Sequence, residues 1–345
     1  MQYDLSVYIG RFQPFHLGHK AVIDQALSNS KRVVVIIGSA DSARSGKNPW
    51  TAVERTEMIR ECYSPEDQQR LVFIPQIDHR YNFDKWLAEV TASVHAIAFA
   101  KWKADPYKIA IIGVEKDHTS FYLKHFPHWE KIEFFPERMI NATDVRRSFF
   151  NVNPEEPLSD HLDVCPMPVR DWLLSWMNTN ALLYNNIADE WNFVEDYKKT
   201  WTLAPFPPTF VTVDAVVTQS AHVLLITRKS RPGMGMLALP GGFIDMHETL
   251  KQSCIRELKE ETRIKVPISV LEGSIVAEKT FDDPNRSERG RTVTTAFHFK
   301  LSEPTLPKVR GADDAATARW VPFDQLRRNQ LYEDHYDILT TMLGI

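Results

Sequence analysis

The sequence predicts an α/β protein of two domains, with a doubly wound parallel sheet in the N-terminal part and a smaller α+β domain in the C-terminal part. The chain has 345 residues, whereas single hydrophobic cores rarely grow much past roughly 250 residues. Short apolar strands alternate with helices up to about residue 150, as in parallel sheets. Beyond residue 205, strands predominate around one amphipathic helix.

The N-terminal elements begin with an apolar strand over Leu5–Ile9, a glycine and a helix over Gly18–Leu27. The next strand, Lys31–Gly38, is almost continuously apolar, as expected for a strand covered on both faces. Further strands are predicted at Leu71–Ile74, Ile109–Ile112 and Ile132–Phe135, and helices at Ala52–Cys62, Phe83–Ser93 and Thr143–Phe150. Such a Rossmann-like sheet binds ligands at the carboxyl ends of its strands.

A domain boundary is predicted where the pattern changes. Helices over Arg170–Tyr184 and Ala188–Lys199 precede Ala204–Thr209, a segment whose prolines exclude a helix. We therefore expect domains at 1–185 and 206–345, joined by a linker at 186–205. The predicted C-terminal strands are Thr209–Thr218, His222–Thr227, Ile268–Ala277 and Thr292–Leu301, and the predicted helices are Thr249–Thr262 and Asp324–Met342.

Composition limits the class of protein. A formal net charge of −4 argues against nonspecific nucleic-acid binding, which usually depends on a large basic excess. Cys62, Cys165 and Cys254 lack the spacing of a zinc site or a disulfide scaffold. The N-terminus has no signal-peptide pattern, and no apolar stretch approaches a membrane span. We expect a cytoplasmic protein with neither nucleic-acid nor membrane partners; homo-oligomerisation stays open.

A phosphate-binding loop is predicted between the first strand and the first helix, where the sequence reads GRFQPFHLGH from Gly10 to His19. Gly10 and Gly18 let the backbone approach a ligand closely. The loop enters a helix N-terminus, whose free N–H groups and dipole favour an anion. His16 and His19, three residues apart, can point the same way and donate to phosphate oxygens.

This loop is similar to that of the HxGH nucleotidylyltransferase superfamily, and most of all to nicotinamide mononucleotide adenylyltransferases of the archaeal type. The segments Gly38–Ala40, Asn48–Arg55 (NPWTAVER) and Ile140–Arg146 (INATDVR) support the resemblance. The last departs from the usual Ser-Gly-Thr or Ser-Ser-Thr by Asn141-Ala142-Thr143. The resemblance implies transfer of AMP from ATP to nicotinamide mononucleotide, giving NAD and pyrophosphate. Phosphopantetheine, flavin mononucleotide or glycerol phosphate are the alternative acceptors.

The implied chemistry needs little general base catalysis, because the attacking phosphate is already ionised and alignment with charge neutralisation suffices. We expect Arg11, His16, His19 and Arg146 to be catalytic, with Mg²⁺ on the triphosphate. The resemblance implies nucleotide contacts from Gly10, Gln13, Gly18, Ser39, Lys47, Asn82, Trp86, Gly113, Lys116, Asp117 and Thr143. A core position for Trp86 is nearly as compatible with its helix as stacking on the pyridinium ring, and a solvated surface pair is equally compatible with Lys116 and Asp117.

A second motif combines Gly242, Glu248 and the run Arg256–Glu261 (RELKEE). On a helix Glu257, Glu260 and Glu261 share one face, where like charges repel without a cation. A solvated acidic face is the usual interpretation of such a run, but the upstream spacing favours a metal site. Hard oxygen ligands select Mg²⁺ or Mn²⁺.

This spacing resembles the Nudix box, which implies an α/β/α sandwich domain that hydrolyses nucleoside diphosphates linked to another group. The resemblance implies metal ligands at Gly242, Glu257, Glu260 and Glu261, of which Glu260 and Glu261 are catalytic, and an orienting role for Arg256. Arg263 stands where the family has a glycine, so either the helix exit differs or a left-handed arginine is tolerated at a cost on the order of 1 kcal/mol.

The hydrolase substrate is predicted from Phe281–Phe297, which resembles segments of ADP-ribose pyrophosphatases. Arg286 and Arg289 would contact an anionic substrate, and Glu278, Asp313 or Asp314 could supply an additional base or ligand from outside the box. We expect hydrolysis of ADP-ribose to AMP and ribose 5-phosphate, and hence a bifunctional enzyme of NAD metabolism. The alternatives are a C-terminal domain that senses ADP-ribose, or one that hydrolyses diadenosine compounds or NAD.

Overall fold

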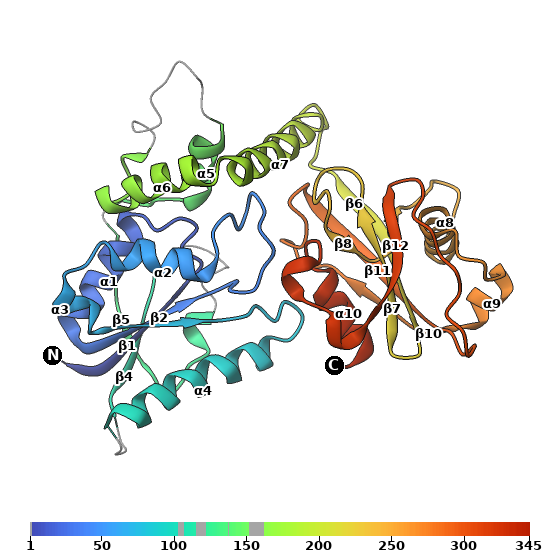
Figure 1. Cartoon of the computed structure of the whole chain (residues 1–345). Coiled ribbons are helices and arrows are strands. Elements are labelled where there is room, and N and C mark those ends of the chain that lie inside the picture. The colour runs from blue at the N-terminus through green and yellow to red at the C-terminus, as the bar shows by residue number, and fades with distance from the viewer. Residues whose placement is uncertain (1, 103–106, 115–121, 137, 152–161) are drawn as a thin grey trace. The chain divides into compact units, whose positions relative to one another are not determined.

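The computed structural model (Figure 1) describes residues 2–102, 107–114, 122–136, 138–151 and 162–345. Two compact units divide at residues 188 and 189. Helix α7, Ala181–Lys199, begins earlier than the predicted Ala188, and α6 covers Met167–Thr179. The domain limits at 185 and 206 remain predictions. Among the described residues, no helix is long and apolar enough to cross a membrane.

The first unit is built on a parallel sheet of five strands in the order β3-β2-β1-β4-β5. The strands are β1 (Tyr3–Gly10), β2 (Ser30–Ile37), β3 (Leu71–Pro75), β4 (Ile109–Ile112) and β5 (Glu130–Ile132). This confirms the predicted doubly wound sheet. The strand predicted at Ile132–Phe135 is wrong except for its first residue, because β4 ends at Ile112, opposite Ile132, and offers no further partner.

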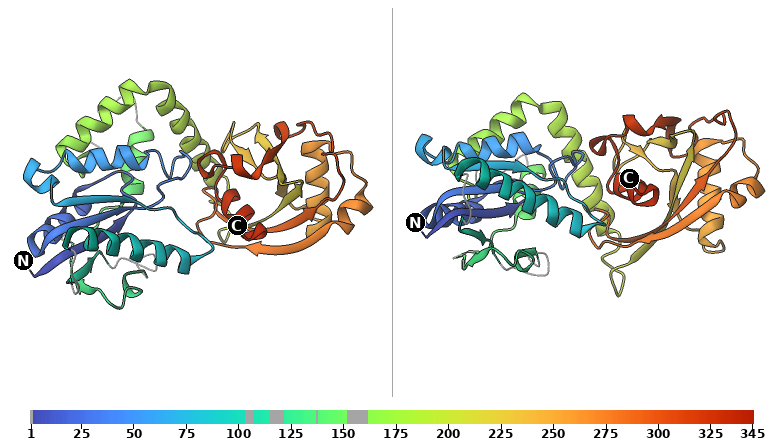
Figure 2. Two further views of the ribbon diagram at one scale, coloured as in Figure 1. Left: turned by 60° about the horizontal axis from the view of Figure 1, so that its bottom comes forward. Right: turned by 90° about the horizontal axis from the view of Figure 1, so that it is seen from below.

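Helices cover both faces of this sheet (Figures 1 and 2). They are α1 (Leu17–Asn29), α2 (Ala52–Arg60), α3 (Pro65–Gln68), α4 (Phe83–Trp102) and α5 (Ala142–Phe150). The side chains of β1 alternate between the faces: Leu5 and Val7 share a buried cluster with Val90 and Val94 of α4, while α1 packs against β1 and β2 on the other face.

The order of the strands reverses between β1 and β4. Gly10 ends β1, and Gly113 follows β4. The predicted phosphate loop therefore starts at the topological switch point, where doubly wound sheets bind their ligands.

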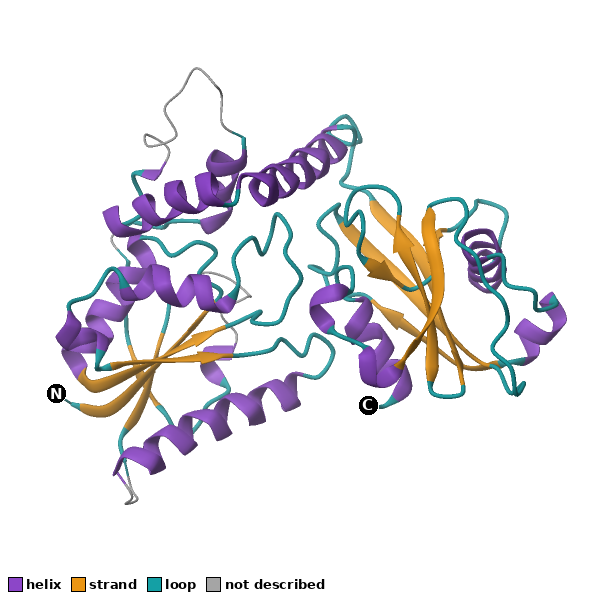
Figure 3. Ribbon diagram, in the orientation of Figure 1, coloured by secondary structure: helices purple, strands orange, loops and turns teal. Residues whose placement is uncertain are grey.

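The second unit is built on a mixed sheet in which β6 and β11 are parallel and the other pairs are antiparallel. The path runs β10-β11-β6-β7-β12, with β8 on β7 and β9 on β6. The strands are β6 (Thr209–Gln219), β7 (His222–Arg228), β8 (Leu237–Ala238), β9 (Gly241–Phe243), β10 (Ile275–Phe281), β11 (Arg291–Lys300) and β12 (Ala315–Pro322). Helices α8 (Leu250–Thr262) and α10 (His335–Leu343) lie on opposite sides of the sheet (Figures 1 and 3), which confirms the predicted sandwich.

Helix α8 carries the second motif and is fixed at both ends. Thr249 and Gln252 form a reciprocal capping box at its start, and Cys254, Ile255 and Leu258 are buried against the sheet. At its end Arg263 adopts the left-handed conformation, with φ 48° and ψ 29°. The helix therefore ends at the position where the Nudix box has a glycine, and a strained left-handed arginine occupies that position.

Two C-terminal predictions were partly wrong. The segment predicted as strand Ile268–Ala277 forms α9 (Ile268–Gly273) followed by β10, and this helix buries Leu271 alone while Ile268 and Val270 are exposed. The helix predicted at Asp324–Met342 is shorter: two 3-10 turns at Phe323–Gln325 and Arg328–Gln330 precede α10. A hydrogen bond of 2.8 Å from Tyr332 N to Leu237 O holds the segment between the second 3-10 turn and α10 against β8.

Candidate active sites

The two histidines of the first motif cap helix α1 with their own rings. His16 is the N-cap: its Nδ1 accepts a hydrogen bond from His19 N at 3.3 Å, and His19 Nδ1 accepts one from His16 N at 3.4 Å. The rings stack with centroids 3.6 Å apart. Because Nδ1 is the acceptor in both neutral imidazoles, Nε2 carries the proton and is the donor.

A cavity of about 150 Å³ adjoins this histidine pair, and Tyr8, Gly10, Tyr122, Arg138 and Ile140 also line it. Gly18, another lining residue, lies so close to the His16 ring that a Cβ there would be 3.1 Å from it. A Cβ at Gly10 would be 2.8 Å from the Phe12 ring. The glycines therefore allow the close packing that sets the histidines beside the cavity.

The buried side chain of Arg146, on α5, contacts the phosphate loop. It is 3% exposed; its Nη1 donates to Gln13 O at 2.6 Å and its Nη2 to Thr143 Oγ1 at 3.1 Å. Asn141, which departs from the family pattern, caps α5 by accepting a hydrogen bond from Thr143 N at 3.0 Å. The structure thus brings the late motif to the loop, and the substituted residue serves as a helix cap.

Arg55 organises this site, although sequence analysis gave it no role. It is fully buried, and its guanidinium donates to the carbonyl oxygens of Arg11, Gly38 and Ser39 at 2.5, 2.7 and 3.2 Å. Burial lowers its pKa to about 10. The position of Arg55 at the end of the NPWTAVER segment could have indicated a role at this site, but the sequence alone does not identify its hydrogen-bond partners.

Gln13 and Ser39 bond to the protein itself. The Gln13 amide pairs with the backbone of Trp50 through hydrogen bonds of 2.8 and 3.1 Å. Ser39, at φ 50°, donates its hydroxyl to Asp78. Their predicted nucleotide contacts stay predictions, and both residues fix the loop that contains Lys47.

The remaining predicted contacts are dispersed. Arg11 is exposed, and Lys47 and Gly113 lie on loops. Asn82 accepts from Lys85 N at the start of α4, and Trp86 packs against Phe83, Tyr122 and Phe126 beside the core. Lys116 and Asp117 lie outside the described residues.

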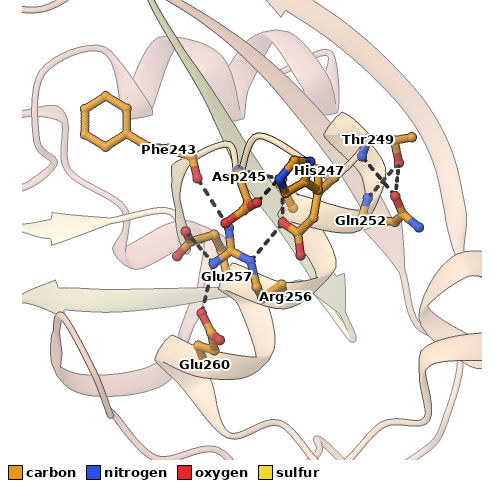
Figure 4. Close-up of polar contacts among 10 residues, drawn as sticks. Phe243, Asp245, His247, Thr249, Gln252, Arg256, Glu257 and Glu260 are labelled. Carbon is orange, nitrogen blue, oxygen red and sulfur yellow. Dashed lines mark hydrogen bonds and ion pairs between the residues drawn. The ribbon is translucent and has the colours of Figure 1, made fainter.

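In the second motif Arg256 lies among three carboxylates, as Figure 4 shows. Its Nε donates to Glu248, and its Nη1 donates to both Glu257 and Glu260, all at 2.9 Å. A longer contact of 3.4 Å runs from Nη2 to Phe243 O. The arginine therefore places a positive charge among these carboxylates and reduces their mutual repulsion.

Glu261 and Gly242 lie at the junction of α8 and β9. A Cβ at Gly242 would be 2.7 Å from Glu257 Oε1, so glycine is needed for the carboxylate to reach the strand. Glu261 is 4% exposed and accepts a hydrogen bond from Gly241 N at 2.9 Å. Burial raises the pKa of Glu261 to about 8, and burial also raises that of Glu257.

These residues fit a divalent cation by their chemistry. Glu257, Glu260, Glu261 and the Gly242 carbonyl offer only hard oxygen donors, and burial of the Glu261 carboxyl outweighs the attraction of Arg228 and raises its pKa. Within the described residues, however, no three acidic, histidine or cysteine side chains form a ready-made metal cluster. The hydrogen bonds of Glu257 and Glu260 to Arg256 account for the lack of such a cluster, because they direct both carboxylates toward the guanidinium.

A cavity of about 180 Å³ adjoins Gly242 and Glu261, and both predicted arginines line it. Arg286 is buried in a two-pronged ion pair with Asp334, with N–O distances of 2.9 and 3.0 Å. The Arg289 guanidinium lies 5.2 Å from the centre of the Phe243 ring. Asp314 also lines the cavity, whereas Glu278 is exposed on β10, outside the lining, and Asp313 is exposed beside Asp314.

Sequence analysis missed several further lining residues, among them Asp214, Tyr332 and His335. These three come from β6 and from the segment before and at the start of α10. Burial lowers the pKa of His335 and raises that of Tyr332. No spacing rule connects these positions with the Nudix box, so only the fold could reveal them.

Comparison with known proteins supports both sites. The Cytidylyltransferase-like family matches residues 7–147, and the NUDIX domain family matches residues 208–342. A nicotinamide/nicotinic acid mononucleotide adenylyltransferase of Acinetobacter baylyi is 39% identical over 150 residues, 43% of this chain and 77% of the relative. An ADP-ribose pyrophosphatase of Methanocaldococcus jannaschii is 33% identical over 129 residues, 37% of this chain and 70% of the relative.

A crystal structure from Francisella tularensis matches the whole chain. It is a bifunctional NMN adenylyltransferase/ADP ribose pyrophosphatase complexed with AMP and a manganese ion, with 37% identity, a TM-score of 0.90 and 99% coverage of both chains. Fold and sites thus define a nucleotidyltransferase unit joined to a Nudix unit. The chain belongs to the family of bifunctional NMN adenylyltransferase/ADP-ribose pyrophosphatases.

Proposed function

We propose that this chain makes NAD at its first site and hydrolyses ADP-ribose at its second. The first unit transfers AMP from ATP to nicotinamide mononucleotide, releasing pyrophosphate. The second cleaves ADP-ribose to AMP and ribose 5-phosphate in a reaction that depends on a divalent cation. The observation that carries the proposal is the placement of both motifs, one at the switch point of a doubly wound sheet and the other on a helix beside a cavity lined by arginines and carboxyl groups.

At the first site, the residues bind and align phosphates. The Nε2–H groups of His16 and His19 would donate to oxygens of the ATP phosphates, since their Nδ1 atoms are engaged by the backbone. Arg146 would add positive charge at the loop. Because the attacking phosphate is already ionised, holding it in line with the α-phosphorus accounts for most of the catalysis.

At the second site, Glu257, Glu260, Glu261 and the Gly242 carbonyl would hold Mg²⁺. A cation held there would supply Lewis-acid stabilisation of the pyrophosphate charge and would help to activate a water. Arg256 would orient the carboxylates, and Arg289 would attract the anionic substrate into the cavity. A cytoplasmic location, the absence of nucleic-acid binding and any homo-oligomer remain predictions.

A panel of acceptors tests the first activity. Purified protein is incubated with ATP, Mg²⁺ and, one at a time, nicotinamide mononucleotide, flavin mononucleotide, phosphopantetheine and glycerol phosphate. We expect product only from the nicotinamide compound or its nicotinic acid analogue. Product from another acceptor, with none from these two, would reject the assignment.

Separation of the two activities tests the second. Glu260→Gln should reduce ADP-ribose hydrolysis by at least about a hundredfold, because removal of a metal-binding charge costs several kcal/mol of transition-state stabilisation. NAD synthesis by the same chain should be unchanged. Glu272→Gln, a change on the exposed face of α9, is the matched control. Joint loss of both activities would contradict two independent sites, and binding of ADP-ribose without turnover by the wild type would favour a sensor.

A further inference from the structure

Two buried side chains outside the Nudix box form part of the wall of the hydrolase cavity. Asp214 lies on β6 and His335 at the start of α10, and they are 5% and 7% exposed. His335 Nδ1 accepts a hydrogen bond from Leu239 N at 3.0 Å. The proton of the neutral imidazole is therefore on Nε2. The hydrogen bonds of the described residues give Nε2–H no acceptor within the protein, so His335 can offer this donor to a ligand at the cavity wall.

Asp214 supplies an acceptor beside that donor. Its Oδ2 accepts a hydrogen bond of 2.6 Å from Thr294 Oγ1. Its Oδ1 lies 3.9 Å from His335 Nδ1, which is too far for a hydrogen bond, and accepts none from the described residues. Both residues line the cavity, so a ligand there can contact the Asp214 acceptor and the His335 donor.

The backbone holds this wall rigidly. Glu333 adopts the left-handed conformation, with φ 45°, and accepts a hydrogen bond from Glu288 N at 2.9 Å. Asp334 is fully buried in its ion pair with Arg286. Strained residues persist where the surroundings determine them, and they concentrate at ligand sites. The His335 ring is therefore held in place before a ligand arrives.

The chemistry of the pair selects a hydroxyl group. A hydroxyl both donates and accepts, so it can give a hydrogen bond to Asp214 Oδ1 and take one from His335 Nε2–H. A phosphate has only acceptors and would meet the Asp214 charge. We infer that Asp214 and His335 bind a ribose hydroxyl of the substrate, and so make the hydrolase selective for sugar-linked nucleoside diphosphates. The inference rests on the proposed hydrolase function.

The test combines a variant with altered substrates. His335→Asn keeps an acceptor near the Nδ1 position for Leu239 N but removes the Nε2 donor. We expect kcat/KM for ADP-ribose to fall about tenfold, the usual effect of one lost hydrogen bond to substrate. ADP-ribose analogues that each lack one hydroxyl, in the adenosine ribose or in the terminal ribose, then locate the contact. Deleting the recognised hydroxyl should slow the wild type about tenfold and cause no additional loss in the variant.

Asp214→Asn is the second variant and should show the same loss of discrimination for the same hydroxyl. His298→Asn is the matched control, because His298 also makes a side-chain hydrogen bond, to Thr218 at 2.8 Å, but lies outside the cavity lining. Urea denaturation followed by pulse proteolysis reports whether the Nudix unit of each variant remains folded. An equal loss on every analogue, or none on ADP-ribose, would overturn the inference.

The proposed function and this inference fail in different ways. Wild-type protein that does not cleave ADP-ribose contradicts the function. Calorimetric titration of ADP-ribose and its analogues with metal chelated still measures hydroxyl recognition. Equal affinity of the wild type for all analogues would then reject the roles of Asp214 and His335.

Discussion

The buried carboxyl of Glu261 should make the stability of the metal-free Nudix unit depend on pH. Its pKa is raised from 4.5 to about 8, chiefly by burial. The folded state therefore binds a proton between these values that the unfolded state has released, and stability falls as pH rises. The stabilisation is fully present below the unfolded pKa and is lost as pH rises through about 8.

The magnitude follows from the two pKa values. Each pKa unit corresponds to about 1.36 kcal/mol, so the whole difference amounts to about 5 kcal/mol. Between pH 6 and pH 9 the loss is about 2.7 kcal/mol, because the Glu261 carboxyl is almost fully protonated at the first pH and largely ionised at the second. A divalent cation at pH 9 should restore the stability by binding the carboxylate.

Urea denaturation with a chelator, followed by pulse proteolysis that separates the transitions of the two units, measures this effect. Glu261→Gln removes the titrating group and should reduce the dependence on pH by about 2.7 kcal/mol over the same interval. Asp245→Asn, an exposed change on the loop before α8, is the control. Equal pH profiles for wild type and Glu261→Gln would refute the reasoning.

Three other substitutions test particular contacts. Arg263→Gly should raise the stability of the Nudix unit by about 1 kcal/mol in urea denaturation by relieving the left-handed strain, whereas Arg263→Ala should not. Tyr332→Phe should leave stability unchanged or raise it by about 1 kcal/mol, because the Tyr332 hydroxyl is buried without a partner among the described residues; a clear loss in the same measurement would reveal one. Arg55→Lys should lower the rate of NAD synthesis at least about tenfold and the melting temperature of the first unit, because lysine cannot reach three carbonyls at once; unchanged synthesis would contradict its positioning role, and ADP-ribose hydrolysis is the internal control.

Local rules predicted the elements that carry both motifs. The strand, glycine and helix of the first motif follow from short-range patterns, as does the carboxylate face of α8. Even there, the mutual capping by His16 and His19 was not predicted, because oxygen-bearing side chains are the usual caps. Likewise, the sequence does not explain why position 242 needs a glycine. The structure does, because the Glu257 carboxylate occupies the space that a side chain at position 242 would need.

Long-range contacts account for what sequence could not supply. Arg55 meets carbonyls from three separate segments, and His335 meets a backbone amide 96 residues away. Such long-range hydrogen bonds follow no fixed spacing in the sequence, so no local pattern predicts them. The short helix at Ile268–Gly273 was missed for a different reason, because an apolar run does not specify whether one face or both are buried.

The position of Arg256 implies that this enzyme carries its own substitute for the metal ion. Without a cation, the carboxylates of Glu248, Glu257 and Glu260 would otherwise repel one another on one short surface. The guanidinium already joins Glu248, Glu257 and Glu260, so it can absorb that repulsion. The Nudix helix can then stay folded in both the metal-loaded and the metal-free state, so a fall in divalent cation concentration need not unfold the second unit.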